Sequence, residues 1–279
     1  MTNSPFVFRR SYRGPVRAVV FDWAGTTVDF GCCSPVMVFV EVFRQQGMSI
    51  TPAQAREPMG TQKRDHIRLI CEMPAVRQQW EKVHGRPPQK SDIDAMYTQS
   101  VPLQTRSVVE HSALIPGCLE TMAALRRRGI GIASTTGYSR EIMDALLPHA
   151  KALGYTPDVT VCASEVPQGR PAPWMLLECA RQLNAFPVES LVKVDDTVPG
   201  ILAGLNGGAW TVAVSATGNE VGLNLDEFNA LDDAERRRHI DRSADKLAQA
   251  GAHYVVDSIA DLLQCIDDIE RRLRGGEKP

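Results

Sequence analysis

The chain has 279 residues, of which 43% are hydrophobic and 23% are charged, and its formal net charge is -2. This usage is that of an ordinary globular protein, and it excludes a disordered, fibrous or disulfide-built chain. The near balance of charge, and the lack of any run of about 20 apolar residues, predict no nucleic-acid partner and no membrane span.

The cysteines and the first residues bear on the compartment. The seven cysteines are an odd number and include no pair spaced for zinc or for a redox motif, so we expect reduced thiols. Residues 1–15 carry polar residues and arginines and lack the apolar centre of a signal peptide. Together these features predict a cytoplasmic protein.

Short, nearly continuous apolar runs predict the strands of a parallel sheet. The first run, at residues 17–21, ends abruptly at Asp22. Similar runs follow at residues 130–133, 159–161, 191–194, 210–214 and 253–256, with helical patterns or loops between them. Such runs are typical of strands buried on both faces, and their alternation with helices indicates a doubly wound α/β sheet.

The segment between the first and second predicted strands has a different pattern. Residues 33–109 show helical patterns but no buried strand. Ser34-Pro35, Thr51-Pro52 and Ser91 with Asp94 each have the composition of a helix start. The sequence therefore predicts a helical domain inserted into the sheet domain.

Polar residues follow four of the predicted strands, where ligands bind in parallel sheets. Asp22 follows the first strand, Thr136 the second, Arg170 comes after the third, and Asp195-Asp196 follow the fourth. Each alone has a common structural explanation as a helix cap, a turn or a surface residue. Their occurrence together at strand ends favours a catalytic site.

These residue types suit phosphoryl transfer, in which catalysis is mainly positioning and charge neutralisation. We expect Asp22 to attack phosphorus. Mg2+ bound by Asp22, Asp196 and the carbonyl of Ala24 would offset the repulsion between the anionic nucleophile and the anionic substrate. The Thr136 hydroxyl and the Arg170 guanidinium would bind phosphoryl oxygens.

At this point the chain resembles the haloacid dehalogenase superfamily, whose first motif is Asp-x-Asp-Gly-Thr. Asp22-Trp-Ala-Gly-Thr matches that motif, and Thr136, Arg170 and Asp195-Asp196 match the later ones. The resemblance covers nearly the entire chain. It implies a Rossmann-like core of residues 1–32 and 110–279, a helical cap of residues 33–109, and an active site between them.

One departure from this pattern narrows the reaction. The phosphatases of the superfamily carry a second Asp that protonates the leaving oxygen, and Ala24 occupies that position. Either the acid and base come from elsewhere, or the leaving group is carbon. Breaking a carbon–phosphorus bond expels a carbanion, which a protonated imine between a lysine and a neighbouring aldehyde can accept. Lys63, in the predicted cap, is suited to form this imine.

The segments around Asp22, Pro58-Met-Gly60, Lys63, Thr136 and Arg170 resemble the phosphonoacetaldehyde hydrolases. This resemblance implies hydrolysis of phosphonoacetaldehyde to acetaldehyde and phosphate, in the degradation of 2-aminoethylphosphonate. It implies Lys63 as the imine-forming residue, Asp22 as the nucleophile, and a homodimer joined through the caps. Further residues are implied to line or support the site: Cys32, Met59, Gly60, His66 and Tyr138.

Two points stay open. Some members carry a further Asp where this chain has Gly200, so Asp195 or Asp196 could be the principal metal ligand. Imine formation needs a neutral amine, and burial with Arg64 or Arg68 nearby would lower the pKa of Lys63 to roughly 7 to 8. The alternatives are a phosphatase that uses Asp22 with Lys63 as a solvated residue, and a catalytically silent phosphate-binding protein.

Overall fold

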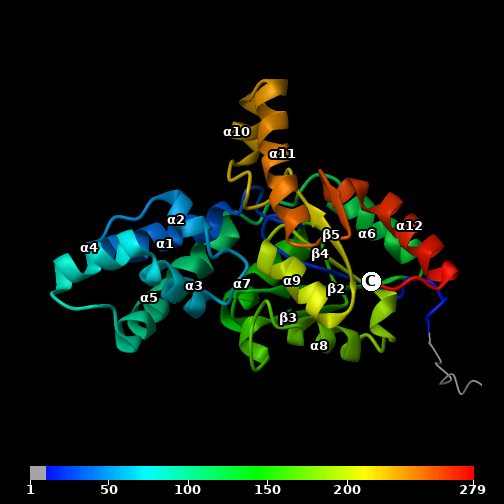
Figure 1. Cartoon of the computed structure of the whole chain (residues 1–279), viewed down its shortest axis with the longest axis horizontal. Coiled ribbons are helices and arrows are strands. Elements are labelled where there is room, and N and C mark those ends of the chain that lie inside the picture. Colours follow the sequence, from blue (N-terminus) through cyan, green and yellow to red (C-terminus); the bar gives the residue numbers. More distant parts are fainter. Residues whose placement is uncertain (1–10) are drawn as a thin grey trace, which may run out of the picture.

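The computed structural model describes residues 11–279 (Figure 1). Residues 1–10 lie outside the described part. They include most of the segment, residues 1–15, that we expect to lack the features of a signal peptide, and they begin the predicted core range of residues 1–32. Six parallel strands form one sheet in the order β3-β2-β1-β4-β5-β6. The strands are β1 (Ala18–Phe21), β2 (Gly131–Thr136), β3 (Val159–Cys162), β4 (Leu191–Asp195), β5 (Trp210–Val214) and β6 (Tyr254–Val256). The predicted doubly wound parallel sheet is confirmed.

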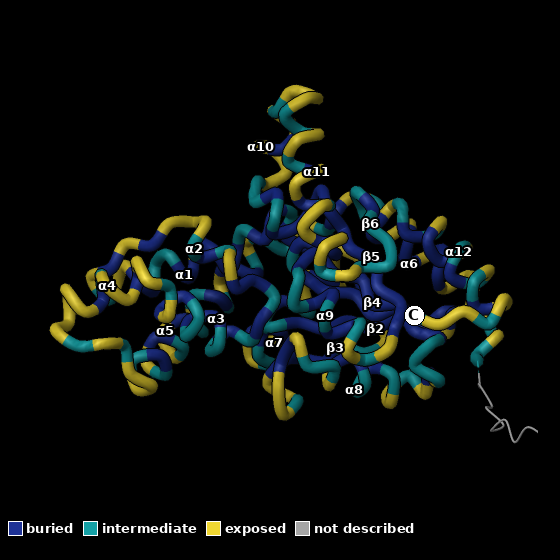
Figure 2. Tube along the Cα trace, viewed as in Figure 1, coloured by how far each residue is buried: buried dark blue, intermediate teal, exposed yellow. Residues whose placement is uncertain are grey.

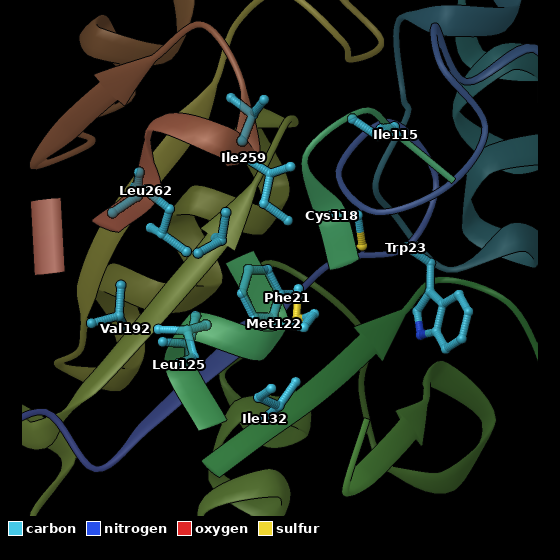
Figure 3. Close-up of a cluster of buried hydrophobic side chains, with 14 of the residues drawn as sticks. Phe21, Trp23, Ile115, Cys118, Met122, Leu125, Ile132, Val192, Ile259 and Leu262 are labelled. Atoms are coloured by element: carbon cyan, nitrogen blue, oxygen red, sulfur yellow. The ribbon is translucent and has the colours of Figure 1, made fainter. Parts of the chain in front are cut away.

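Helices cover both faces of the sheet, because the central strand is apolar on both sides. Val19 and Phe21 of β1 face a cluster with α6 (Cys118–Arg127), α7 (Arg140–Ala152) and α12 (Leu262–Gly275). Figure 3 shows Phe21 among these side chains. Ala18 and Val20 face the opposite cluster, to which α8 (Trp174–Gln182) contributes. Helix α9 (Val198–Gly207) packs beside α8. The apolar run of β1 is therefore continuous because both of its faces are buried under helices, as the sequence predicts.

The insert after β1 is entirely helical and has its own apolar centre. It consists of α1 (Cys33–Gln45), α2 (Pro52–Arg56), α3 (Lys63–Glu72), α4 (Pro74–His84) and α5 (Lys90–Glu110). These helices lie to one side of the sheet (Figure 1) and share a buried cluster that includes Phe39, Ile67 and Trp80. Val108, near the end of α5, packs instead with the core. The helical cap is confirmed, while boundaries at residues 33 and 109 remain a prediction.

Two helix starts differ from their predicted positions. Helix α1 begins at Cys33, ahead of Ser34-Pro35, because the Asp29 carboxylate accepts hydrogen bonds from the backbone N–H groups of Cys33 and Ser34. Helix α5 begins at Lys90, ahead of Ser91, because Asp92 reaches back to the N–H of Gln89. In both cases a carboxylate replaces the expected serine cap.

A helical arm projects from the core. It consists of α10 (Leu225–Ala230) and α11 (Asp233–Gln249), and its tip is largely exposed (Figures 1 and 2). The remaining elements are the short 3-10 helices at Ala163–Glu165, Val188–Ser190 and Ile259–Asp261.

The seven cysteines all lie in the described part of the chain, and each is a free thiol. Within residues 11–279, no helix combines the length and the apolar composition of a membrane span.

Candidate active site

Asp22 stands at the carboxyl end of β1, the central strand of the sheet. Its backbone N–H donates to the carbonyl of Val194 at 2.9 Å, which continues the pairing with β4. The Arg170 guanidinium donates to its carboxylate at 2.5 Å and to the backbone carbonyl of Thr135 at 2.9 Å. Burial raises the pKa of Asp22, and Arg170 opposes that rise. Arg170 therefore favours the ionised carboxylate that a nucleophile requires.

Two further carboxylates lie beside Asp22. Oxygen atoms of Asp22, Asp195 and Asp196 fall within 4.8 Å of one another, and all three residues are buried. Lys193 pairs with Asp195 at 2.8 Å, and Arg170 lies 3.4 Å from the same carboxylate. Three buried carboxylates thus share two buried cations.

The pKa values of the two adjacent aspartates, Asp195 and Asp196, are shifted in opposite directions. Although burial opposes it, the charges of Arg170 and Lys193 hold the pKa of Asp195 below its usual range. Burial, with Asp22 and Asp195 nearby, raises the pKa of Asp196 to about 8. Asp196 is the carboxylate that most needs another positive charge. An oxygen donor set with this excess of negative charge fits a hard divalent cation, which would stabilise ionised Asp196.

Position 200, where some members carry a further Asp, has no room for a side chain in this structure. A Cβ atom at Gly200 would lie 1.9 Å from the carboxyl carbon of Asp195. The Asp195 side chain therefore occupies the space that any side chain at position 200 would need. It is held there by the Thr197 hydroxyl, which donates to it at 2.7 Å.

Lys63 enters the site from the first turn of α3 in the cap. Its side chain is buried, and Nζ lies 4.7 Å from the centroid of the Tyr138 ring and 5.5 Å from that of Phe39. Burial lowers the pKa of Lys63 to about 8, while Cys32 and Asp22 oppose the shift. At pH 7 about a tenth of this amine is therefore unprotonated, far more than for a solvated lysine.

The expected role of Arg64 and Arg68 in this shift is wrong. Arg64 pairs with Asp94 at 2.5 Å, and Arg68 pairs with Asp65 and Glu72. Carboxylates thus neutralise both arginines. Desolvation of Lys63 is the largest cause, and the nearby cation that adds to it is Arg170.

One small cavity joins the two halves of the site. Its volume is about 20 Å³, the space of about one water molecule. It lies between the end of β1 and the start of α3. Most of the predicted site residues line it, namely Asp22, Ala24, Cys32, Met59, Gly60, Lys63, Thr136, Tyr138 and Arg170.

The supporting residues have distinct contacts. Cys32 donates its thiol to Asp196 at 3.3 Å, and burial raises the pKa of that thiol well above its usual range. Thr136 accepts a hydrogen bond from the N–H of Tyr138 at 3.1 Å, an arrangement in which its own hydroxyl can still donate to a ligand. Gly60 lies against Thr197, since a Cβ there would come within 2.3 Å of its hydroxyl oxygen. Gly60 thus allows the cap backbone to approach Thr197 of the core closely.

His66 lies behind the cavity and does not line it. Its ring stacks on Phe39 at 4.0 Å, and Nε2 lies 2.8 Å from the carbonyl of Ala55. Burial lowers the pKa of His66 well below its usual value, so the neutral ring donates to that carbonyl. Phe39 thus contacts the His66 ring and also lies near Nζ of Lys63.

Several residues that contact the site belong to none of the motifs recognised in the sequence. Lys193 is a cation within an apolar strand, and a buried lysine requires a carboxylate partner, so this signal was readable in the sequence. Thr135 accepts from both Lys193 and Arg170. Asn219, in the loop after β5, donates its backbone N–H to Asp196 at 2.8 Å. Nothing in the composition of that loop indicates this contact.

Known proteins with the same overall structure place the chain in a family. The model of the haloacid dehalogenase-like hydrolases matches residues 16–208. The chain is 46% identical to a phosphonoacetaldehyde hydrolase of Nitratidesulfovibrio vulgaris, over 99% of this chain and 98% of that protein. It is also 46% identical to a phosphonoacetaldehyde hydrolase-like protein of Syntrophobacter fumaroxidans, over 98% and 99% of the two chains.

A solved structure agrees with these relatives. The crystal structure of a phosphonoacetaldehyde hydrolase-like protein from Oleispira antarctica is 44% identical and superposes with a TM-score of 0.97, covering 99% of this chain and 100% of that one. Family model, sequence relatives and structure thus agree over nearly the full length. The chain is a hydrolase that belongs to the haloacid dehalogenase superfamily and, within it, to the phosphonoacetaldehyde hydrolase family.

Proposed function

We propose that the protein hydrolyses the carbon–phosphorus bond of phosphonoacetaldehyde to acetaldehyde and phosphate, in the degradation of 2-aminoethylphosphonate. The observation that carries the proposal is the single cavity lined by both Lys63 of the cap and Asp22 of the core. An amine and a carboxylate nucleophile at one site match a substrate that has an aldehyde beside its phosphoryl group.

The cap residue would act on the aldehyde. Neutral Lys63 attacks the carbonyl carbon, and the adduct takes up one proton from solvent and loses water, which gives a protonated imine. Its amine is available because burial lowers its pKa to about 8. The aromatic rings of Tyr138 and Phe39 exclude water around Nζ while offering their faces to the positive charge of the imine.

The core residue would act on phosphorus. An Asp22 oxygen forms the new bond to phosphorus as the carbon–phosphorus bond breaks, and that electron pair moves into the imine to give an enamine. Arg170 and the Thr136 hydroxyl bind the phosphoryl oxygens during transfer. Protonation of the enamine and hydrolysis return Lys63 and release acetaldehyde. A second water hydrolyses the aspartyl-phosphate and releases phosphate.

A metal ion fits the same scheme. Asp22, Asp196 and the carbonyl of Ala24 would hold Mg2+, with Asp195 close enough to contribute. The ion would supply positive charge next to the phosphoryl group. Ala24 itself supports a carbon leaving group, because no carboxylic acid stands there to protonate an oxygen.

The test is trapping of the imine. Protein, phosphonoacetaldehyde and Mg2+ are mixed with borohydride, and intact mass is measured for wild type, Lys63→Arg and the exposed-lysine control Lys82→Arg. We expect a reduced two-carbon adduct in wild type and the control, and none in Lys63→Arg. Phosphate release without an adduct, and unaffected by Lys63→Arg, would leave an Asp22 phosphatase instead. Neither adduct nor phosphate would indicate a silent binding protein.

We also propose that two copies associate through their caps and that the protein acts in the cytoplasm. Met37 on α1 and Val83 on α4 expose 61% and 47% of their surface, which offers apolar area on the cap for such a contact. Sedimentation of wild type and Met37→Glu checks the association, and cell fractionation checks the compartment.

A further inference from the structure

Arg56, the last residue of α2, joins the cap to two other segments. Its guanidinium donates to the carbonyl of Gly31 at 2.6 Å and to the carbonyl of Gly222 at 2.9 Å. Gly31 lies in the linker that leads from the core into α1, and Gly222 lies in the core loop after β5. A single cap side chain thus ties the cap to its linker and to the core.

Asn219 extends this contact to the three-carboxylate cluster. Its side-chain amide donates to the carbonyl of Arg56 at 3.2 Å, and its side-chain oxygen lies 3.4 Å from the Arg56 guanidinium. The backbone N–H of the same residue donates to Asp196 at 2.8 Å. One buried residue therefore connects the position of Arg56 to the orientation of Asp196.

Arg56 also precedes the segment that carries the cap's half of the site. The N–H of Met59 donates to the carbonyl of Arg56 at 3.0 Å, and residues 57–62 lead directly to Lys63. In this segment Gly60 rests on Thr197 of the core. Holding Arg56 in place therefore holds Met59 and Lys63 against the core.

We infer that Arg56 is a latch, a positioning residue whose bonds to Gly31 and Gly222 keep the cap closed and keep Lys63 and Asp196 in register. The inference rests on the proposed function, because that reaction needs groups from both halves at once. Domain closure is commonly held by a few contacts near the linker, and hydrogen bonds from a cation are stronger than neutral ones.

The kinetic test compares substitutions at Arg56 with one at a surface arginine. If the latch is lost, the closed fraction falls and kcat/KM falls with it, so we expect a loss of at least about 30-fold for Arg56→Ala. Arg56→Lys can restore one of the two bonds and should lose about fivefold. Arg44→Ala removes an exposed cap arginine that pairs with Glu41 on its own helix, and it should stay within about twofold of wild type.

A second readout needs no substrate. The amide of Gly31 donates to the carbonyl of Thr217 at 2.8 Å, and the amide of Asn219 donates to Asp196. We expect hydrogen exchange at these two amides to be at least about tenfold faster in Arg56→Ala, while the amides of β1 and β4 exchange as in wild type. A purely structural role would accelerate exchange throughout the core.

The outcomes separate the latch from the proposed reaction. Wild type that forms no borohydride adduct contradicts the reaction, and the exchange measurement then still tests the latch. Unchanged exchange together with kcat/KM within twofold in Arg56→Ala overturns the latch. If Arg56→Ala does not fold, Arg56→Lys decides: a folded variant with faster exchange at Gly31 and Asn219 supports it, and global destabilisation there as well overturns it.

Discussion

Two buried lysines, one in the core and one in the cap, are held in opposite ways. Lys193 on β4 has Asp195 at 2.8 Å, within a cluster that Arg170 completes. Lys63 on α3 faces the rings of Tyr138 and Phe39. Burial lowers the pKa of both, but at Lys193 a carboxylate in direct contact opposes that effect.

Under the proposed reaction, this difference separates a structural cation, Lys193, from a reactive amine, Lys63. A lysine paired with a carboxylate stabilises its neighbours as a permanent charge, whereas a desolvated lysine gives up its proton easily. The core therefore carries an assembled charge network around Asp22. The cap supplies Lys63, whose lowered pKa would make the neutral amine of the proposed imine step more accessible than in a solvated lysine.

The largest expected effect comes from removing the core nucleophile. Asp22→Asn should lower phosphate release by about 10⁴-fold or more, because the uncharged amide oxygen is a far weaker nucleophile than a carboxylate oxygen. The borohydride adduct at Lys63 should persist, since imine formation uses the aldehyde alone. A phosphate assay and intact mass on the same sample check both halves.

Loss of the adduct as well would show that the two halves do not act separately. The charge of Asp22 raises the pKa of Lys63, so its removal should if anything favour the neutral amine.

A smaller effect is expected when the core pair is broken. Lys193→Met keeps the length of the side chain but leaves Asp195 with Arg170 as its remaining cation. Removing one partner of a buried pair costs about 3–5 kcal/mol, which should appear as a lower free energy of unfolding in urea. Lys82→Met, at an exposed cap position, is the control. A loss under about 1 kcal/mol would mean that Arg170 alone neutralises Asp195.

The mildest effect concerns pH. Because the folded protein lowers the pKa of Lys63 to about 8, the neutral amine forms at lower pH than for a solvated lysine. The rate of adduct formation should rise about tenfold per pH unit below this value and level off above it. Rapid-quench borohydride trapping across the pH range measures the midpoint.

The same profile tests the cause of the shift. Arg64→Ala and Arg68→Ala should leave the midpoint unchanged, because the carboxylates of Asp94, Asp65 and Glu72 already neutralise these side chains. A midpoint that rises in either variant would restore the charge-based explanation over desolvation.

Most of the fold can be predicted from the sequence because strands buried on both faces appear in it as continuous apolar runs. The runs at residues 17–21 and 191–194 are apolar apart from Arg17 and Lys193, and each contains most of a strand of the sheet. The arm formed by α10 and α11 has no comparably clear sequence pattern. Helix α11 has few apolar residues, and only Ile240, Ser243 and Leu247 are buried, so its packing depends on the core surface that it meets.

The site divides in the same way. Asp22, Thr136 and Arg170 were predictable, because each follows a strand and a parallel sheet brings strand ends together. The links between parts of the site were not. That Asp195 fills the space beside Gly200, or that Asn219 reaches Asp196, depends on side-chain geometry across loops distant in sequence.

The small volume of the cavity between cap and core limits the size of the molecule that can bind there. A space of about 20 Å³ does not accommodate an aldehyde with a phosphoryl group, so under the proposed reaction the cap must stand further from the core when substrate is bound than it does in this structure. A substrate with a longer carbon chain would hold the cap further from the core. Under the proposed reaction, the fit of the cap would therefore favour short carbon chains.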